Sequence, residues 1–239
     1  RPARRLSRGE HLLGPDGQPF LVVGPRTEAG DTLTVELCAD DPLAVLTAVG
    51  EPPLPPYITA PLADPERYQT VYAQRPGSAA APTAGLHLTA ELLDALVGGG
   101  VPLARVELVV GLDTFQPVSE QDPTRHRIHS ERYHVPPETL EACRESTRVV
   151  AVGTTAVRAL ESAAVGPAAG RTRLFIHRPY EWQLVDLLLT NFHLPRTTLL
   201  MMIDAFVGAR WRDLYSVALA DGYRFLSFGD AMLLRRDGA

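Results

Sequence analysis

The sequence predicts an α/β protein in which a mixed, partly parallel sheet forms the larger part of the chain. From residue 59 onward, apolar runs typical of buried strands alternate with segments that begin at helix-capping residues. Residues 1–50 differ, because short strand patterns there are separated by turns that contain Gly and Asp. A Pro-rich stretch at residues 51–58 divides the two regions and predicts a semi-rigid connection.

The composition excludes several classes of protein. The formal net charge of −5 excludes an overall polycation, so any RNA contact must come from a local patch. Cys38 and Cys143 make no metal or disulfide motif, and the histidines lack the paired spacing of zinc enzymes, so we expect no metal. No apolar run is long enough to span a membrane, and the arginine-rich start is not followed by the apolar segment of a signal peptide. We therefore expect a soluble, cytoplasmic protein without membrane contact.

In residues 1–50, strands are expected at Phe20–Val23 and Leu33–Leu37. Two or three strands make a poor independent sheet. They either complete a β-barrel whose other strands lie outside this sequence or pack on the larger region. The opening Arg1–Leu6 starts no clear element, so we expect the chain to begin in mid-fold.

The next region of interest is a loop of small residues at 76–89, which carries Thr83 and His87. Small residues let a ligand approach backbone N–H groups closely. Thr89 is the expected N-cap of a helix that runs through Val97, which places His87 near a helix N-terminus. A loop that merely connects two elements is the alternative.

A predicted strand at Arg105–Gly111 precedes the most basic stretch of the chain, Arg125–His134. Its alternation predicts an extended segment with one polar face. The residues of that face are Arg125, Arg127, His129 and Glu131. Guanidinium groups contact phosphates or stack on bases, and a local excess of cations in an acidic protein favours a contact surface over a solvated charge run.

A predicted buried strand at Arg148–Gly153 turns directly into a helix at Ala156–Ala164. Free N–H donors at the positive end of a helix bind anionic groups, so this turn could hold a phosphate, a carboxylate or a ribose. Thr154 and Thr155 add hydroxyl donors. Arg158, one turn into the helix, either supports this site or faces solvent.

Further strands are expected at Leu174–Ile176 and Gln183–Thr190, and the second leads into a corner with Asn191 and His193. Ligands meet the carboxyl edge of an α/β sheet at such corners. A packing role for both residues is the alternative. A helix capped by Thr197 or Thr198 follows, and a surface helix is expected at Trp211–Asp221.

Seven motifs, taken in order, resemble the S-adenosylmethionine:tRNA ribosyltransferase-isomerase family of queuosine biosynthesis. They are Leu54–Ile58, Arg67–Ala73, Pro82–His87, Ile128–Glu131, Gly153–Thr155, Thr190–Pro195 and Phe228–Met232. Each motif is modest alone, but the resemblance is collinear from about the first strand to the C-terminus.

The resemblance implies an α/β (α+β) fold with a mixed, partly parallel sheet domain and part of an inserted small β-barrel. Residues 1–50 would belong to the barrel, 51–58 would form the connection, and 59–239 would form the catalytic domain. The implied reaction moves the ribosyl moiety of S-adenosylmethionine to 7-aminomethyl-7-deazaguanine at the tRNA wobble position. It gives epoxyqueuosine and releases adenine and methionine. No cofactor beyond S-adenosylmethionine as co-substrate is implied, the partner is the tRNA anticodon loop, and we favour a monomer.

Such a reaction needs particular groups. A sulfonium acidifies neighbouring ribose protons, so a base must take one as adenine leaves. The candidates for this base are His87, His129, His193 and Glu131. The expected donors to ribose hydroxyls or to the methionine carboxylate are Thr83, Thr154, Thr155 and Asn191. A base splayed out of an anticodon loop stacks on an aromatic ring or an arginine plane. The candidate platforms are Phe115, Tyr133 and Phe192.

Two departures from the family keep other functions open. The family's N-terminal segment is not in this sequence, and Asp113 stands where a small residue is expected, so acceptor handling could differ. One alternative is a paralogue that uses the same donor with a small-molecule acceptor. The other is a truncated, non-catalytic RNA-binding protein.

Overall fold

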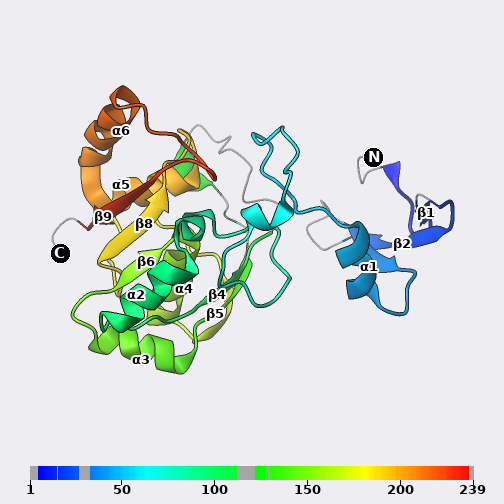
Figure 1. Cartoon of the computed structure of the whole chain (residues 1–239), viewed down its shortest axis with the longest axis horizontal. Helices are drawn as coiled ribbons and strands as arrows, with labels where there is room; N and C mark the ends of the chain where they lie inside the picture. Colours follow the sequence, from blue (N-terminus) through cyan, green and yellow to red (C-terminus); the bar gives the residue numbers. More distant parts are fainter. Residues whose placement is uncertain are drawn as a thin grey trace. The chain divides into compact units, whose positions relative to one another are not determined.

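The computed structural model describes residues 5–14, 16–26, 33–111, 122–126, 128 and 130–236. Its contacts divide the chain into two compact units, Arg1–Glu51 and Pro52–Ala239 (Figure 1). These are called the N-terminal unit and the C-terminal unit. The predicted α/β class is confirmed, but the described strands form three small sheets, of which one is partly parallel.

The N-terminal unit contains an antiparallel sheet and one unexpected helix. The strands β1 (His11–Leu13), β2 (Pro19–Arg26) and β3 (Leu33–Leu37) pair in that order, and the described strands do not close into a barrel. Helix α1 (Pro42–Val49) was not predicted. The sequence does contain a local pattern that predicts a helix start here, a capping residue followed by proline. Asp41 Oδ1 accepts a hydrogen bond from the backbone N–H of Ala44 at 3.0 Å, and Pro42 is the first residue of the helix.

The C-terminal unit contains the other two sheets. The strands β4 (Glu107–Val109), β5 (Glu131–His134) and β7 (Ala169–Thr172) form an antiparallel sheet. In the second sheet, β8 (Leu187–Asn191) lies between β6 (Val150–Val152), to which it is parallel, and β9 (Ala231–Arg235), to which it is antiparallel (Figure 1).

One predicted strand in this unit is wrong. The apolar run Leu174–Ile176 has irregular backbone, and the strand in this part of the chain is β7, which ends just before the run and pairs with β5. Ile176 is nevertheless only 2% exposed. The run is apolar because it fills the core, and burial alone does not distinguish a strand from a packed irregular segment.

Four α-helices described in the C-terminal unit begin close to where the sequence predicts: α2 (Ala90–Gly98), α4 (Thr154–Val165), α5 (Thr198–Val207) and α6 (Trp211–Ala220). Helix α3 (Pro137–Glu145) lies between β5 and β6. Short 3-10 turns are η2 (Pro65–Tyr68), η3 (Thr83–His87), η5 (Pro123–Arg125) and η6 (Gly208–Arg210). Thr89 and Thr197 cap α2 and α5 through their side chains, because each hydroxyl satisfies an N–H group of the first turn.

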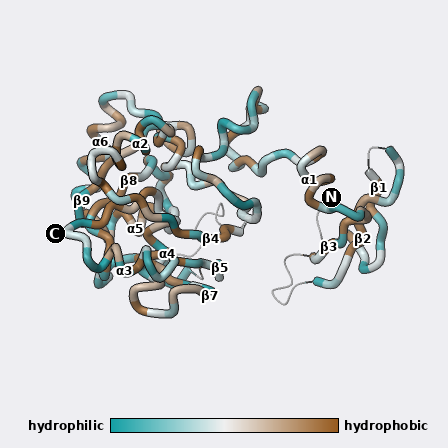
Figure 2. The backbone as a smooth tube through the Cα atoms, turned by 60° about the horizontal axis from the view of Figure 1, so that its bottom comes forward, coloured by the Kyte–Doolittle hydropathy of each residue, from teal (hydrophilic) through white to brown (hydrophobic). Residues whose placement is uncertain are grey.

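The core of the C-terminal unit surrounds β8. Leu188 of β8, Val157 of α4, and Ile203 and Phe206 of α5 are all fully buried. Figure 2 shows hydrophobic residues concentrated in β8 and α5. The parallel pair β6–β8 is therefore covered by apolar side chains, as parallel sheets generally are.

A buried carboxylate holds the chain that leads into β8. Glu161 on α4 is 0% exposed, and its two oxygens accept hydrogen bonds from the backbone N–H groups of Gln183, Leu184 and Val185 at 2.9–3.0 Å. The hydroxyl of Tyr180 donates to it as well, at 3.2 Å. This carboxylate fixes residues 183–185 against α4, and hence the start of β8.

The Pro-rich segment packs on the C-terminal unit. Pro55 is fully buried, and the hydroxyl of Tyr57 lies 2.7 Å from Oγ of Ser227. The ring of Tyr68, which is 4% exposed, meets the ring of Phe228 edge-on at 5.8 Å between centroids. Residues near 55–68 are therefore attached to the loop that precedes β9.

Candidate active site

The carboxyl ends of β6 and β8 meet at one edge of their sheet, as parallel neighbours must. The backbone N–H of Gly153, which follows β6, donates to the carbonyl of Leu189 in β8 at 2.8 Å. Asn191 ends β8 and is 3% exposed. The predicted corner residue and the predicted anion-binding turn thus lie at the same edge.

Three predicted site residues form one hydrogen-bonded cluster at this edge. The hydroxyl of Thr83 donates to Oδ1 of Asn191 at 3.0 Å, and Nδ2 of Asn191 lies 3.3 Å from Nε2 of His87. The hydrogen bond from Thr83 assigns the orientation of the Asn191 amide, so Nδ2 is the donor and Nε2 of His87 is the acceptor. His87 is exposed, whereas Asn191 is buried. The cluster therefore presents an imidazole at the surface above a fixed amide.

Two glycines allow η3 to reach this position. A Cβ on Gly85 would overlap the hydroxyl of Tyr72, so a larger residue could not pack there. Gly153 has φ of +89°, which favours glycine, and a Cβ built on it would lie 3.7 Å from Cβ of Ala84 in η3. The turn η3 is therefore packed between Tyr72 and the turn that starts α4.

The first turn of α4 adds donors beside the cluster. Thr154 and Thr155 belong to this turn and are partly buried, and the N-cap residue, Gly153, has no side chain that could accept from the first N–H groups of the helix. Free backbone N–H groups and the helix dipole favour an anionic or hydroxyl-bearing ligand here. The turn η3 packs against this helix start, so the cluster and the helix start lie at the same edge of the sheet.

His193 lies apart from the cluster. Its ring Nε2 is 3.1 Å from the hydroxyl of Thr190, and its backbone N–H donates to the hydroxyl of Tyr215 at 2.9 Å. Burial lowers the pKa of His193 to about 4, so its ring is neutral at pH 7. In the described residues, no hydrogen bond joins it to Asn191 or His87.

Glu131 and Arg158 form a buried ion pair. Arg158 Nη1 bonds Oε2 of Glu131, and their side chains are 11% and 6% exposed. Burial lowers the pKa of Arg158, while the charge of Glu131 opposes that shift. The expectation that Glu131 shares an exposed face with Arg125 is wrong, because Glu131 turns inward from β5 toward α4. Its carboxylate is occupied by a cation and is a weaker candidate for the base.

The remaining candidates do not join the cluster. Arg125 lies in η5 with 83% of its side chain exposed, and it pairs with Asp122 at 3.4 Å.

Two of the candidate stacking platforms are buried. Tyr133 and Phe192 are 3% and 4% exposed, so their rings offer no free face to a nucleobase. The hydroxyl of Tyr133 donates to the carbonyl of Pro167, and Phe192 packs in an aromatic group with Tyr215, Tyr223 and Phe225. Phe115, Arg127 and His129, together with Asp113, lie outside the described residues.

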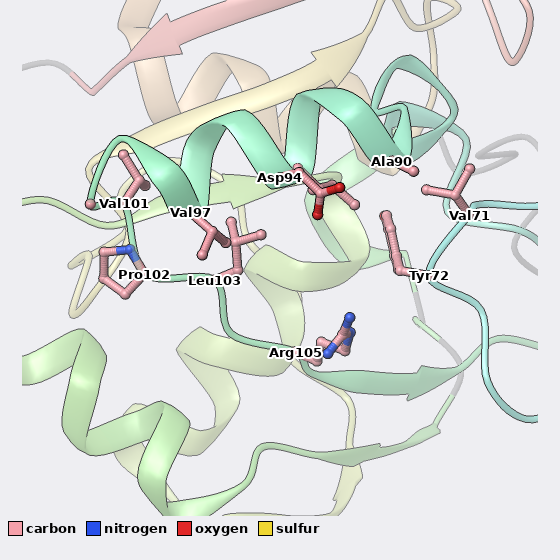
Figure 3. Close-up of a pocket in the computed structure, with 11 residues that line it drawn as sticks. Val71, Tyr72, Ala90, Asp94, Val97, Val101, Pro102, Leu103 and Arg105 are labelled. Carbon is pink, nitrogen blue, oxygen red and sulfur yellow. The ribbon is translucent and has the colours of Figure 1, made fainter.

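A groove of about 740 Å³ lies beside η3 and was not predicted. It is bounded by α2, by residues 100–105 and by Val71 and Tyr72. Its walls are mainly apolar, and Figure 3 shows Asp94 and Arg105 extending into it from opposite sides. Tyr72 belongs to both regions, because it lines the groove and its hydroxyl lies against Gly85.

The last motif, Phe228–Met232, contributes to the site through its backbone, which its side chains do not predict. The backbone carbonyl of Asp230 accepts a hydrogen bond from Nδ2 of Asn191 at 3.4 Å. Gly229 has no room for a Cβ, because one would overlap the carbonyls of Arg224 and Phe225. The signal was present in the motif Phe228–Met232, but a role for a backbone carbonyl cannot be read from side chains.

Within the part of the chain that the structure describes, no helix is long and apolar enough to cross a membrane. In the same residues, no three His, Cys, Asp or Glu side chains gather as a set that could hold a metal ion.

A family profile described as "Queuosine biosynthesis protein" matches residues 1–234. The chain belongs to this queuosine biosynthesis family. The resemblance inferred from the seven motifs is thereby confirmed.

Three similar curated relatives share the name S-adenosylmethionine:tRNA ribosyltransferase-isomerase. The relative from Rubrobacter xylanophilus is 49% identical and is matched over 100% of this chain and 71% of its own length. The relative from Symbiobacterium thermophilum is 48% identical over 98% of this chain and 72% of its own length. The relative from Thermus thermophilus is 57% identical over 81% of this chain and 59% of its own length.

A solved structure in the family is similar as well. It is a crystal structure of an S-adenosylmethionine tRNA ribosyltransferase from Thermotoga maritima, with 46% sequence identity and a TM-score of 0.52. The match covers 63% of this chain and 50% of that one.

Proposed function

We propose that this chain is an S-adenosylmethionine:tRNA ribosyltransferase-isomerase. It moves the ribosyl moiety of S-adenosylmethionine to 7-aminomethyl-7-deazaguanine at the wobble position of tRNA, which gives epoxyqueuosine and releases adenine and methionine. Family membership supports the reaction. The observation that carries the site is the cluster of Thr83, Asn191 and His87 at the carboxyl edge of the β6–β8 pair.

The donor binds, in this proposal, at the surface formed by η3 and the first turn of α4 at the carboxyl edge of the sheet. The sulfonium compound carries ribose hydroxyls and an amino-acid carboxylate, which both need hydrogen-bond donors. Thr154 and Thr155 supply hydroxyls there, and the helix start supplies free N–H groups and a positive dipole. Thr83 and Asn191 lie beside this helix start, because η3, which carries Thr83, packs against Gly153.

His87 takes the acidified ribose proton on Nε2, its one unprotonated ring nitrogen, after the N–H of Asn191 gives up its hydrogen bond to that atom. Among the candidates that the structure describes, it alone is both exposed and part of the cluster. His193 is held apart with its ring nitrogen beside Thr190, and Glu131 is paired with Arg158. A neutral imidazole is a competent base near pH 7, and a positioned base contributes roughly 100-fold or more to rate.

The substrates indicate where the reaction takes place and which cofactor it needs. The acceptor is a tRNA anticodon loop, so the reaction takes place in the cytoplasm, and the donor itself supplies the transferred group without a further cofactor. Residues 1–50, with the sheet β1–β3, are part of the inserted β-barrel, residues 51–58 connect it, and residues 59–239 form the catalytic domain.

The test is release of adenine from S-adenosylmethionine, with and without tRNA that carries the 7-aminomethyl-7-deazaguanine base. We expect release that depends on this tRNA. His87→Asn should lower the rate by about 100-fold, since it removes the base but keeps a hydrogen-bonding side chain. His134→Asn, at an exposed histidine on β5, is the matched control and should keep full activity.

Release without RNA would instead indicate a small-molecule acceptor. No release under any of these conditions would exclude catalysis by this chain.

A further inference from the structure

Among the described aromatic residues, three rings are prominently exposed. Tyr57, Tyr223 and Phe228 are 42%, 47% and 38% exposed. An exposed aromatic ring offers a face on which a planar ligand such as a nucleobase can stack.

Tyr57 and Phe228 come from distant parts of the chain and meet at one place. The hydroxyl of Tyr57 is bonded to Oγ of Ser227, the residue next to Phe228. Phe228 in turn rests on the buried ring of Tyr68. Burial raises the pKa of Tyr68 to about 12, so this supporting ring stays neutral. The exposed rings of Tyr57 and Phe228 are thus held beside the buried residues Tyr68 and Ser227.

The loop that carries Phe228 is tightly built. Leu226 has φ of +73°, a left-handed conformation that costs a non-glycine residue about 1 kcal/mol or more. Its backbone N–H donates to the carbonyl of Phe192 at 3.0 Å, and Asp230 accepts the N–H of Arg224 at 2.7 Å. A loop held in this way presents Phe228 in a fixed orientation, which lowers the entropy cost of stacking.

The same loop reaches the cluster. The carbonyl of Asp230 accepts the amide N–H of Asn191, so Phe228 lies two residues from a contact of the proposed active site. Tyr223 instead packs its ring edge-on against Phe192, at 5.7 Å between centroids, and is not bonded to the Tyr57–Ser227 pair.

Positive charge accompanies these rings. Arg224 is 76% exposed and has Asp230 at 3.7 Å as a loose partner. Arg67, which precedes Tyr68, is exposed too. Rings for stacking and guanidinium groups for phosphates are the combination that binds single-stranded nucleic acid. S-adenosylmethionine has no phosphate, so the arginines favour the RNA over the donor.

We propose that Tyr57 and Phe228 form the stacking surface for the splayed-out base of the acceptor RNA, with Arg224 meeting a neighbouring phosphate. This inference rests on the proposed function and deepens it, because it places the acceptor on the loop that precedes β9. It also supplies a platform in place of Tyr133 and Phe192, whose rings are buried.

The experiment measures two affinities for each variant of the full chain. One is for an anticodon stem-loop RNA that carries the 7-aminomethyl-7-deazaguanine base, by fluorescence anisotropy. The other is for S-adenosylmethionine, by calorimetry. Phe228→Leu and Tyr57→Leu keep apolar volume but remove the aromatic face. Each should weaken RNA binding by about 10-fold and leave the donor affinity unchanged.

Three further variants sharpen the comparison. Tyr57→Phe keeps the ring and should bind RNA within about twofold of the unmodified chain. Arg224→Gln should reduce the slope of log affinity against log salt by about 1, the signature of one lost phosphate contact. Tyr223→Leu, at the third exposed ring, is the matched control and should leave both affinities unchanged.

The proposal is overturned if Phe228→Leu and Tyr57→Leu bind RNA normally, if they lose donor affinity instead, or if Tyr223→Leu loses as much RNA affinity as they do. In each of these cases the unmodified chain still releases adenine only with the tRNA, so the proposed function stands. If the unmodified chain neither binds the RNA nor responds to it, both the stacking surface and the proposed function are excluded.

Discussion

Asn191 connects the parts of the candidate site through a single side chain. Its oxygen accepts from Thr83, and its NH₂ group faces both His87 and the carbonyl of Asp230. An amide suits this position because it accepts on one side and donates on the other. A carboxylate of the same shape could accept only.

Asn191→Asp tests whether the hydrogen bonds donated by Asn191 position His87. A carboxylate can accept from Thr83 but cannot donate to Nε2 of His87 or to the carbonyl of Asp230, so adenine release should slow by about 10-fold or more. Asn191→Ala, which removes all three contacts, should slow it at least as much. Unchanged release in Asn191→Asp would mean that the hydrogen bonds donated by Asn191 do not position His87.

His193 should make the folded chain sensitive to acid. Its pKa falls from 6.5 to about 4 on folding, so below pH 6.5 the unfolded chain binds a proton that the folded chain does not. The stability that this neutral ring provides is complete above pH 6.5 and is lost as the pH falls toward 4. At pH 5 the loss is about 2 kcal/mol. His193→Gln should remove that part of the decrease in urea-unfolding free energy between pH 7 and pH 5, and equal decreases in both proteins would contradict the assignment.

At the scale of elements, the turn between β6 and α4 depends on one glycine. Gly153 has positive φ, and the space beside it is open to a Cβ at ordinary contact distance from Ala84. Gly153→Ala should therefore cost about 1–2 kcal/mol of unfolding free energy through backbone conformation alone. Gly98→Ala is the control: Gly98 lies at the end of α2 with open space around it, and its replacement should be neutral or stabilising by up to about 1 kcal/mol. Equal effects would show that the positive φ carries no cost.

The link between α4 and the start of β8 depends on Glu161. Glu161→Gln would turn an NH₂ group toward backbone N–H donors and leave at least one of them without an acceptor. We expect a loss of about 2–3 kcal/mol in urea-unfolding free energy. Glu181→Gln, at an exposed carboxylate on the same connecting segment, should change stability by less than about 0.5 kcal/mol. A small effect at Glu161 would mean that the three N–H groups find other partners.

The two units of the whole molecule differ in the size of their cores. In the described residues of the N-terminal unit only Val23 is buried, whereas the C-terminal unit has a continuous core around β8. Local opening costs least where few apolar contacts are lost. Amide hydrogens in β2 should exchange with solvent faster than those in β8, by an order of magnitude or more. Hydrogen exchange read by mass spectrometry checks this, and equal protection would indicate a core that the N-terminal unit does not display.

The sequence by itself determined the family, the α/β class and most helix starts, because capping residues, buried runs and small-residue turns act over a few neighbours. Thr89 and Thr197 cap helices as their local pattern predicts. It also singled out Thr83, His87 and Asn191 as candidate site residues, and the structure places these three in one hydrogen-bonded cluster. Local pattern failed where an apolar run filled the core without becoming a strand, as at Leu174–Ile176.

Only the tertiary structure decided which candidates meet. It joins Asn191 to residues more than a hundred positions earlier, pairs Glu131 with Arg158, and buries Tyr133 and Phe192 while Tyr57 and Phe228 stay exposed. Burial and partnership depend on chain segments that are distant in sequence, and a residue's own neighbours do not encode them. For that reason a side chain that can act as a base or a stacking surface is recognised from sequence, while its role follows from what the fold places beside it.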